Sequence, residues 1–136
     1  MIDRLDDPRV PALPTHSHAV RVGNLVFIAG QVGIPLGEDH APAGFADEVG
    51  VALDALDAVL ETVGATRGTV LRTNCYLANI DQMPEFNAVY LARFGDLRPA
   101  RTTTQARLAH GLRFEIDAVA LCEPEHHQAP AKPAAA

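Results

Sequence analysis

The sequence predicts a single α+β domain in which two helices lie on one face of a mainly antiparallel or mixed sheet, in the order ββαβαββ. Two segments show the helical spacing of apolar residues, and five short runs around them are typical of strands. With 136 residues, of which 48% are apolar and 21% charged, the chain is long enough for one ordinary core. Short strands that alternate with two helices favour a two-layer α+β domain over residues 15–122.

The first structural unit is a β-hairpin that follows an extended N-terminal arm. Prolines at positions 8, 11 and 14 favour an extended arm over residues 1–14. Residues 19–22 and 25–29 have strand composition, and Gly23-Asn24 between them is typical of a tight hairpin turn. Residues 30–44 are rich in glycine and proline, which predicts a long loop.

The rest of the domain alternates between helices and strands. Apolar residues recur at helical spacing from Val49 to Val63, and Gly64 supplies a stop. Residues 69–78 predict a central strand, and a second helix follows with Asp81 as its cap and an apolar stripe up to Phe94. Strands at 101–107 and 112–121 complete the sheet. Residues 123–136 lack periodicity, which predicts a disordered tail.

The charge and the hydropathy pattern disfavour two classes of partner. The net charge of −6 gives no general attraction to nucleic acid or to anionic lipid. The longest apolar run, residues 25–29, is far shorter than the ~20 residues of a membrane-spanning helix. Because the N-terminal segment is acidic where a secretory signal is basic, we expect a cytoplasmic protein.

The cysteines and histidines predict neither disulfides nor a metal site. Cys75 and Cys122 lie in strand-like segments without a CxxC spacing, so we expect two buried free thiols. His16, His18 and His110 lack the local ligand pairing of a zinc centre, so we expect no metal.

The last strand has two different faces. Residues alternate between the two faces of a strand, so Glu115 and Asp117 share one face with Val119 and Leu121. A face that is charged at one end and apolar at the other is neither ordinary surface nor ordinary core. It predicts packing against other copies of the chain.

A candidate anion site lies just before this strand, in Pro99-Ala100-Arg101-Thr102-Thr103-Thr104. A guanidinium group offers a planar fork of donors that matches a carboxylate, and the three hydroxyl groups beside it add further polar contacts. Together with Glu115, these groups indicate a site for a small carboxylate and a water molecule.

Four blocks, in order, resemble the Rid family of reactive intermediate deaminases, also called YjgF. The resemblance spans residues 14–122 and rests on Ser17 to Gln31, Asn87 to Tyr90, Pro99 to Thr102 and Phe114 to Ala120. It implies a chorismate-mutase-like fold, a homotrimer, and three clefts that lie between neighbouring subunits.

The resemblance also implies an activity, namely cofactor-independent hydrolysis of the 2-imino and enamine acids that pyridoxal-phosphate enzymes release, giving a 2-keto acid and ammonia. It places Arg101 on the substrate carboxylate, Glu115 on the attacking water and Asn87 near the cleft. The candidate catalytic residues are Glu115, Arg101 and His16, and the candidate substrate-binding residues are Arg101, Thr103, Asn87, Ala29 and Gly30. Some of these residues also have an interpretation without a function in the site. Arg101 would be solvated, Asn87 would be a surface residue, and Glu115 would form an ion pair with Arg113 or Arg101. For the neighbouring Asp117 the expected role is structural.

Several positions depart from the usual pattern of the family. His16 replaces a tyrosine and His18 a glutamine, which changes the polar rim, while Ala29 removes a serine hydroxyl. Thr103 replaces a cysteine and keeps a hydrogen-bonding group, and one residue is deleted after Thr104. His16 is either a proton-transfer group or an exposed loop residue.

Three other functions remain open from the sequence. The altered pocket is compatible with a specialised biosynthetic enzyme that acts on a related imine or enamine, or with a non-catalytic binder of small carboxylates. Ribonuclease activity, which some relatives show, is disfavoured by the net negative charge and by the lack of a basic or aromatic-rich patch.

Overall fold

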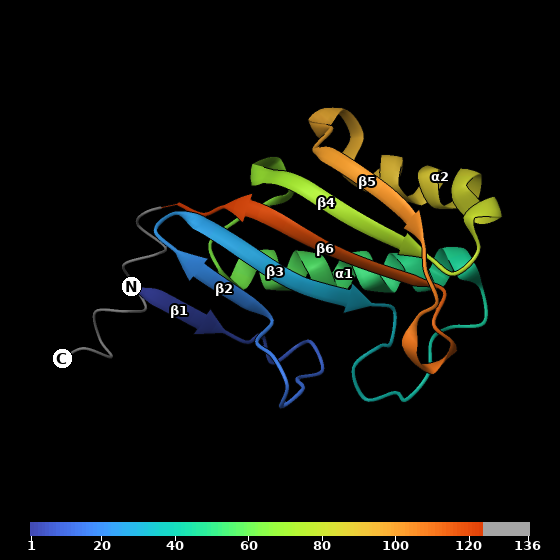
Figure 1. The fold of residues 1–136 in the computed structure, drawn as a ribbon, viewed down its shortest axis with the longest axis horizontal. Helices are drawn as coiled ribbons and strands as arrows, with labels where there is room; N and C mark the ends of the chain where they lie inside the picture. Colours follow the sequence, from blue (N-terminus) through green and yellow to red (C-terminus); the bar gives the residue numbers. More distant parts are fainter. Residues whose placement is uncertain (124–136) are drawn as a thin grey trace.

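The computed structural model describes residues 1–123, which form one six-stranded sheet with two helices on one face (Figure 1). The expected tail lies almost wholly outside the described residues. The strands are β1 (Ile2–Leu5), β2 (Ala19–Val22), β3 (Leu25–Val32), β4 (Val70–Leu77), β5 (Ala100–Gln105) and β6 (Phe114–Leu121), and the helices are α1 (Phe45–Thr62) and α2 (Met83–Phe94).

The sheet is mixed, as the sequence predicts, and has the strand order β1-β2-β3-β6-β4-β5. Only β4 and β5 run parallel, and α2 forms the crossover between them. The predicted order ββαβαββ is thus confirmed, with one strand added at the start. β1 pairs antiparallel with β2 inside the segment expected to be an extended arm, and the two residue pairs at its ends are Ile2 with Val22 and Leu5 with Ala19.

Both predicted helices are present, with changes at their N-terminal ends. α1 begins at Phe45, four residues before Val49, and ends just before Gly64, whose φ of +75° is easily adopted only by glycine. Before α2, a short 3₁₀ turn covers Ile80–Gln82, and the Asn79 side chain accepts a hydrogen bond from the Asp81 amide at 3.0 Å. The prediction that Asp81 caps α2 is therefore wrong: Asn79 caps the 3₁₀ turn, and the N-cap residue of α2 is Gln82, whose side chain makes no capping hydrogen bond.

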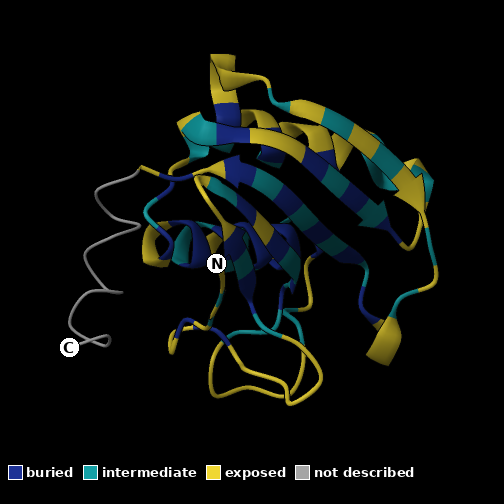
Figure 2. Cartoon of the chain, turned by 60° about the vertical axis from the view of Figure 1, so that its left-hand side comes forward, coloured by how far each residue is buried: buried dark blue, intermediate teal, exposed yellow. Residues whose placement is uncertain are grey.

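The hydrophobic core lies between the helices and the sheet, where Figure 2 shows the buried residues. Phe86 of α2 contacts Phe114 of β6, with the ring centroids 5.1 Å apart. Cys75 and Cys122 are buried free thiols, as expected. Burial raises the pKa of the Cys75 thiol to about 12, so this group is an inert part of the core.

β3 is longer than its sequence predicts. It continues through Gly30 to Val32, so the loop covers only residues 33–44, and the pairing register with β6 shifts between Ile28 and Gln31. A register shift of this kind is a β-bulge, which bends the strand and redirects side chains. The bulge places Ala29 and Gly30 beside β6.

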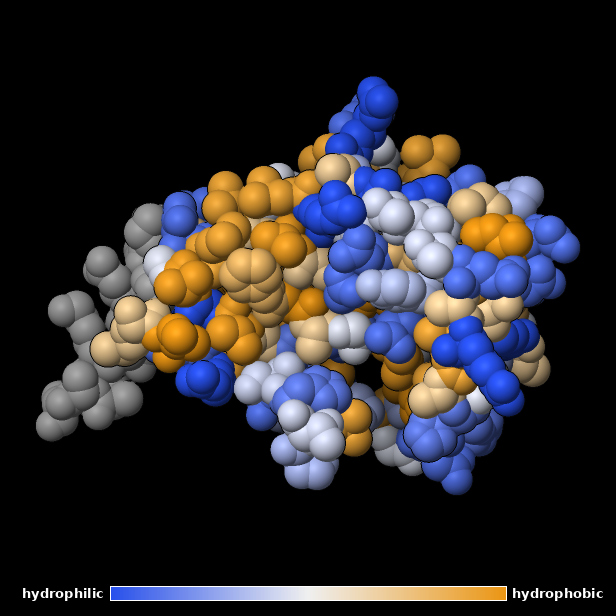
Figure 3. Space-filling view, viewed as in Figure 1, coloured by the Kyte–Doolittle hydropathy of each residue, from blue (hydrophilic) through white to orange (hydrophobic). Residues whose placement is uncertain are grey.

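The other face of the sheet is not covered by helices. In Figure 3, apolar side chains gather over β1 to β3 and the neighbouring end of β6. We call this cluster the apolar sheet patch; its most exposed members from the paired strands are Ile2 (55% exposed), Val22 (44%), Phe27 (47%) and Leu121 (37%). Neither helix in residues 1–123 is long and apolar enough to cross a lipid bilayer.

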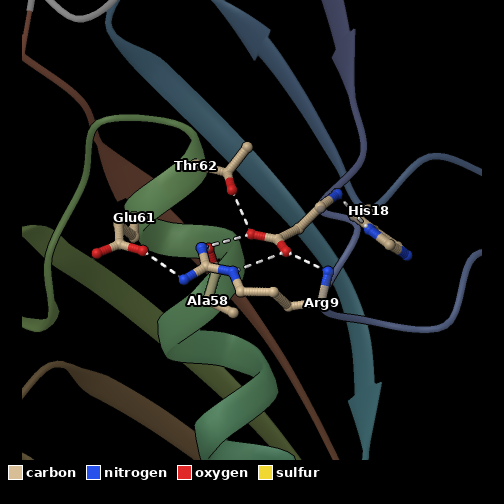
Figure 4. Close-up of polar contacts among 6 residues, drawn as sticks. Arg9, His18, Ala58, Glu61 and Thr62 are labelled. Carbon is tan, nitrogen blue, oxygen red and sulfur yellow. Dashed lines mark hydrogen bonds and ion pairs between the residues drawn. The ribbon is translucent and has the colours of Figure 1, made fainter. Parts of the chain in front are cut away.

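An ion-pair network attaches the N-terminal arm to the end of α1 (Figure 4). The buried carboxylate of Asp7 accepts hydrogen bonds from the Arg9 side chain, at 2.8 Å from Nη2, and from the Thr62 hydroxyl. Arg9 also bonds Glu61 at 2.6 Å. The Arg9 guanidinium and the Thr62 hydroxyl outweigh the effect of burial and lower the pKa of Asp7 to about 2.

His18 belongs to this attachment and not to a site rim, which corrects the expectation from the sequence. Its ring is buried, with Nδ1 accepting from the Asp7 amide at 2.8 Å and Nε2 lying 3.0 Å from the carbonyl oxygen of Pro11. The first contact fixes Nε2 as the protonated nitrogen, which donates to Pro11. His18 therefore holds the arm against β2 and β3.

Candidate active site

Arg101 lies in the edge strand β5 and points toward α2. Its register partner on β4 is Thr73, which is buried on the helix side and bonded to the Tyr90 hydroxyl at 2.8 Å. The guanidinium carbon of Arg101 stands 4.9 Å from the ring centroid of Phe86 and 4.8 Å from that of Tyr90. Its Nη2 donates to Asn87 Oδ1 at 2.8 Å. Two aromatic rings and one amide thus fix the plane of the guanidinium.

The fixed guanidinium of Arg101 has no carboxylate partner among residues 1–123. Its remaining N–H donors are available to an anion, so Arg101 is neither a mobile surface group nor half of an ion pair. Thr103 lies two residues along β5 on the same face, and its buried Oγ1 has no hydrogen-bond partner in the described part of the chain. A buried hydroxyl without a partner is costly, and a bound ligand would remove this cost.

Glu115 lies on the open face of the sheet. Its neighbours Phe114 and Ile116 are fully buried beneath the helices, so alternation along β6 turns Glu115 the other way. A Cβ atom added to Gly30 would lie 2.1 Å from Glu115 Oε2. The carboxylate therefore rests against the bulge of β3, where only glycine leaves room for it.

The electrostatic surroundings of Glu115 favour a base rather than an ion pair. Partial burial and the nearby carboxylate of Asp117 raise the pKa of Glu115, while His16 lowers it. Arg113 is occupied elsewhere, because its Nε donates to the buried Glu48 at 2.7 Å. Within residues 1–123 of one chain, Glu115 therefore pairs with neither Arg113 nor Arg101.

Asp117 is held by two residues that the sequence analysis missed. Asn74 Nδ2 donates to one carboxylate oxygen and the Tyr76 hydroxyl to the other, both at 2.9 Å. Tyr76 is also the register partner of Glu115 on β4. The sequence pattern of β4 could have placed both residues on the open face of the sheet, because Asn74 and Tyr76 alternate with buried neighbours. Asp117 thus has the structural role expected of it.

His16 and Ala29 also lie on the side of Glu115. His16 is close enough to lower the pKa of Glu115, and its Nδ1 contacts the Thr15 hydroxyl at 2.7 Å. Ala29 lies in the bulge next to Gly30, and its amide donates to the His18 carbonyl at 2.9 Å. Within residues 1–123, no three His, Cys, Asp or Glu side chains gather as metal ligands.

The candidate residues thus form two groups on opposite faces of the sheet. We call Asn87, Arg101 and Thr103 the anchor half-site, and His16, Ala29, Gly30 and Glu115 the carboxylate half-site. The sheet separates the two within one chain. A small molecule cannot contact Arg101 and Glu115 of the same subunit at once.

The comparison with known proteins identifies the family to which this fold belongs. The family model described as Endoribonuclease L-PSP, which covers the YjgF/RidA proteins, matches residues 8–122. The chain belongs to this Rid family. The resemblance that the sequence blocks indicate is therefore confirmed.

Individual relatives give the same result. The chain is 34% identical to the 2-iminobutanoate/2-iminopropanoate deaminase of Mus musculus over 115 residues, which cover 83% of this chain and 85% of the relative. It is 32% identical to Protein HMF1 of Saccharomyces cerevisiae over 110 residues, covering 80% and 85%. The crystal structure of RidA from the Antarctic bacterium Psychrobacter sp. PAMC 21119 superposes with a TM-score of 0.83 at 27% identity, covering 88% and 98%.

Proposed function

We propose that this protein is a cofactor-independent deaminase that hydrolyses small 2-imino acids, or their enamine tautomers, to a 2-keto acid and ammonia. The observation that carries the proposal is the fixed guanidinium of Arg101, which has no acidic partner among the described residues. Such a group is prepared for a carboxylate before the ligand arrives. Relatives of about one-third identity that are named 2-iminobutanoate/2-iminopropanoate deaminases support the same reaction.

The proposed active site is assembled from two copies of the chain. Because the two half-sites lie on opposite faces, the anchor half-site of one subunit has to meet the carboxylate half-site of another. Contacts of this head-to-tail kind close into a ring, and a homotrimer has three such clefts. Burial of the apolar sheet patch in the assembly would remove its exposed surface from water.

The chemistry needs only water and proton transfers. Arg101 holds the substrate carboxylate, and Glu115 of the neighbouring subunit accepts a proton from water as the oxygen bonds to the imine carbon. Glu115 passes this proton to the imine nitrogen, which gives a carbinolamine. In our proposal His16 then donates a second proton to the nitrogen, the carbon–nitrogen bond breaks, and the nitrogen leaves as ammonia. The carbinolamine hydroxyl returns its proton to His16 and becomes the carbonyl group of the 2-keto acid. No electron is gained or lost, so the reaction uses no redox cofactor.

The first test follows hydrolysis of 2-iminopropanoate and 2-iminobutanoate, generated in situ by an amino-acid oxidase. We expect wild type to accelerate ammonia release, Arg101→Ala to lose substrate binding, and Glu115→Gln to lose turnover. A wild type that produces no acceleration would contradict the proposal.

A subunit-mixing experiment tests the assembly. Arg101→Ala and Glu115→Gln are each expected to be inactive alone, but random mixed trimers should recover about a quarter of the wild-type clefts, because each cleft draws one half-site from each of two subunits. An unmixed blend of the two variants is the control. Mixed trimers without activity would contradict a site shared between subunits.

Two alternatives would respond differently to the same variants. Ala29, which lacks the serine hydroxyl, favours a specialised enzyme that acts on a related imine or enamine; this enzyme would need Glu115 but would not accelerate the two test reactions. A non-catalytic binder of small carboxylates would lose its ligand in Arg101→Ala and keep it in Glu115→Gln.

A further inference from the structure

A second arginine shares a hollow with the anchor residue. Arg98 and Arg101 both line a hollow of about 240 Å³ beside the C-terminal part of α2. Its walls also include Tyr90, Leu91 and Phe94, so two arginines line an otherwise largely apolar hollow. We call this the arginine hollow. Its volume is below the ~300–1,000 Å³ of sites for drug-sized molecules, which fits a small metabolite.

Five of the ten arginines of this chain form ion pairs among the described residues, and Arg98 and Arg101 belong to the five that do not. Those that form ion pairs are Arg9, Arg21, Arg67, Arg93 and Arg113. Neither Arg98 nor Arg101 forms one within residues 1–123, although the chain has a net charge of −6. Two positively charged residues that line one small hollow favour an anion that contacts both.

The backbone at Arg98 supports a special role for this position. Its φ of 47° and ψ of 59° are in the left-handed region, which is unfavourable for a residue other than glycine. The residue lies between the 3₁₀ turn Gly95–Leu97 and Pro99, and a following proline disfavours the helical alternative. The chain thus turns sharply at Arg98 just before β5 begins.

We propose that Arg98 binds a second acidic group of the substrate, and that the preferred substrates are 2-imino dicarboxylic acids with a short chain between the carboxylates. This inference rests on the proposed function and narrows its substrate class. Arg101 holds the carboxylate next to the imine carbon, while Arg98 holds the distal carboxylate across the arginine hollow. The apolar walls contact the methylene groups between them.

Binding of reaction products tests the proposal without requiring catalysis. Isothermal titration compares 2-oxoglutarate, which has two carboxylates, with 2-oxobutanoate, which has one. Because a hydrogen bond to a charged group contributes about 1.5–3 kcal/mol, we expect wild type to bind 2-oxoglutarate roughly 10- to 100-fold more tightly. Arg98→Gln should lose most of this preference and keep the affinity for 2-oxobutanoate, while Arg98→Lys should keep part of the preference.

Arg107→Gln is the matched control, because Arg107 is another exposed arginine that lines a different hollow, and the substitution changes the net charge equally. It should leave the preference unchanged. Equal affinity of wild type for the two oxo acids would overturn the proposal, and so would an equal loss of preference in Arg107→Gln. Kinetics with 2-iminoglutarate and 2-iminobutanoate distinguish a failure of the proposed deaminase activity from a failure of the proposed dicarboxylate site. A wild type that hydrolyses neither imine but prefers 2-oxoglutarate through Arg98 contradicts the deaminase and retains the dicarboxylate site.

Discussion

Replacement of Gly30 by alanine should displace the proposed base, Glu115, and leave the proposed substrate anchor, Arg101, in place. The added Cβ would lie 2.1 Å from Glu115 Oε2, whereas an ordinary contact begins at 3.4 Å, so the carboxylate has to retreat by roughly 1.3 Å. A misplacement of about 1 Å at a catalytic group can cost 100-fold in rate, or about 2.7 kcal/mol of transition-state stabilisation. We expect kcat for 2-iminobutanoate to fall about 100-fold, with KM nearly unchanged because Arg101 belongs to the other half-site.

The assay is steady-state hydrolysis, with Gly68→Ala as the control. A Cβ at Gly68 makes its nearest contact at 3.5 Å, which is ordinary van der Waals distance, and the residue lies in the 3₁₀ turn before β4. This variant should retain wild-type kinetics. Thermal unfolding of both variants separates a lost fold from a displaced carboxylate.

A double-mutant cycle gives the sharper result. In a Glu115→Gln background the catalytic carboxylate is already absent, so Gly30→Ala should cause little further loss of kcat. If Gly30→Ala alone retained activity within about threefold of wild type, the contact between Gly30 and Glu115 would not position the base. If both changes reduced kcat independently, Gly30 would act through another group.

Three further outcomes follow from the structure. Asp7→Asn should lower the free energy of unfolding at pH 7 by about 2 kcal/mol, because the pKa of Asp7 is about 2 instead of 3.8. This contribution is present above pH 3.8 and disappears as the pH falls toward 2. Chemical denaturation at several pH values measures it. Asp117→Asn removes a negative neighbour that raises the pKa of Glu115, so the acidic limb of the kcat/KM profile against pH should move to lower pH. A limb that stays at the same pH would show that Asp117 does not raise the pKa of Glu115. Gly50→Ala in α1 should stabilise the fold by up to about 1 kcal/mol in thermal unfolding, since its Cβ would meet no atom closer than 3.5 Å.

The sequence predicts the elements of this fold well, because they depend on local patterns. The apolar repeat from Val49 to Val63 and the turn at Gly23-Asn24 identify α1 and the hairpin directly. Strand β1 escapes prediction because four residues next to several prolines carry too little pattern. Its pairing depends on the exposed edge of β2, which is a tertiary feature.

The candidate site is less visible in the sequence, because its geometry depends on tertiary packing. Alternation along β6 places Glu115 on a face, but only the sheet register shows that Arg101 lies on the other side. The bulge that brings Gly30 against Glu115 is likewise a property of the paired strands. His18 shows the same limit, since it lies in a block that resembles the family but its buried ring forms hydrogen bonds with the N-terminal arm.

The central position of β6 has a consequence for how the chain acquires its structure. The last strand in the sequence lies between β3 and β4, so it joins two parts of the sheet that make no ladder with each other. During synthesis, both the hairpin and the β4–β5 pair emerge from the ribosome before the strand that connects them. The sheet can close only after residue 121 is available, and until then the edges of β3 and β4 stay open to other chains. A truncation before Phe114 would remove the middle of the domain rather than its end.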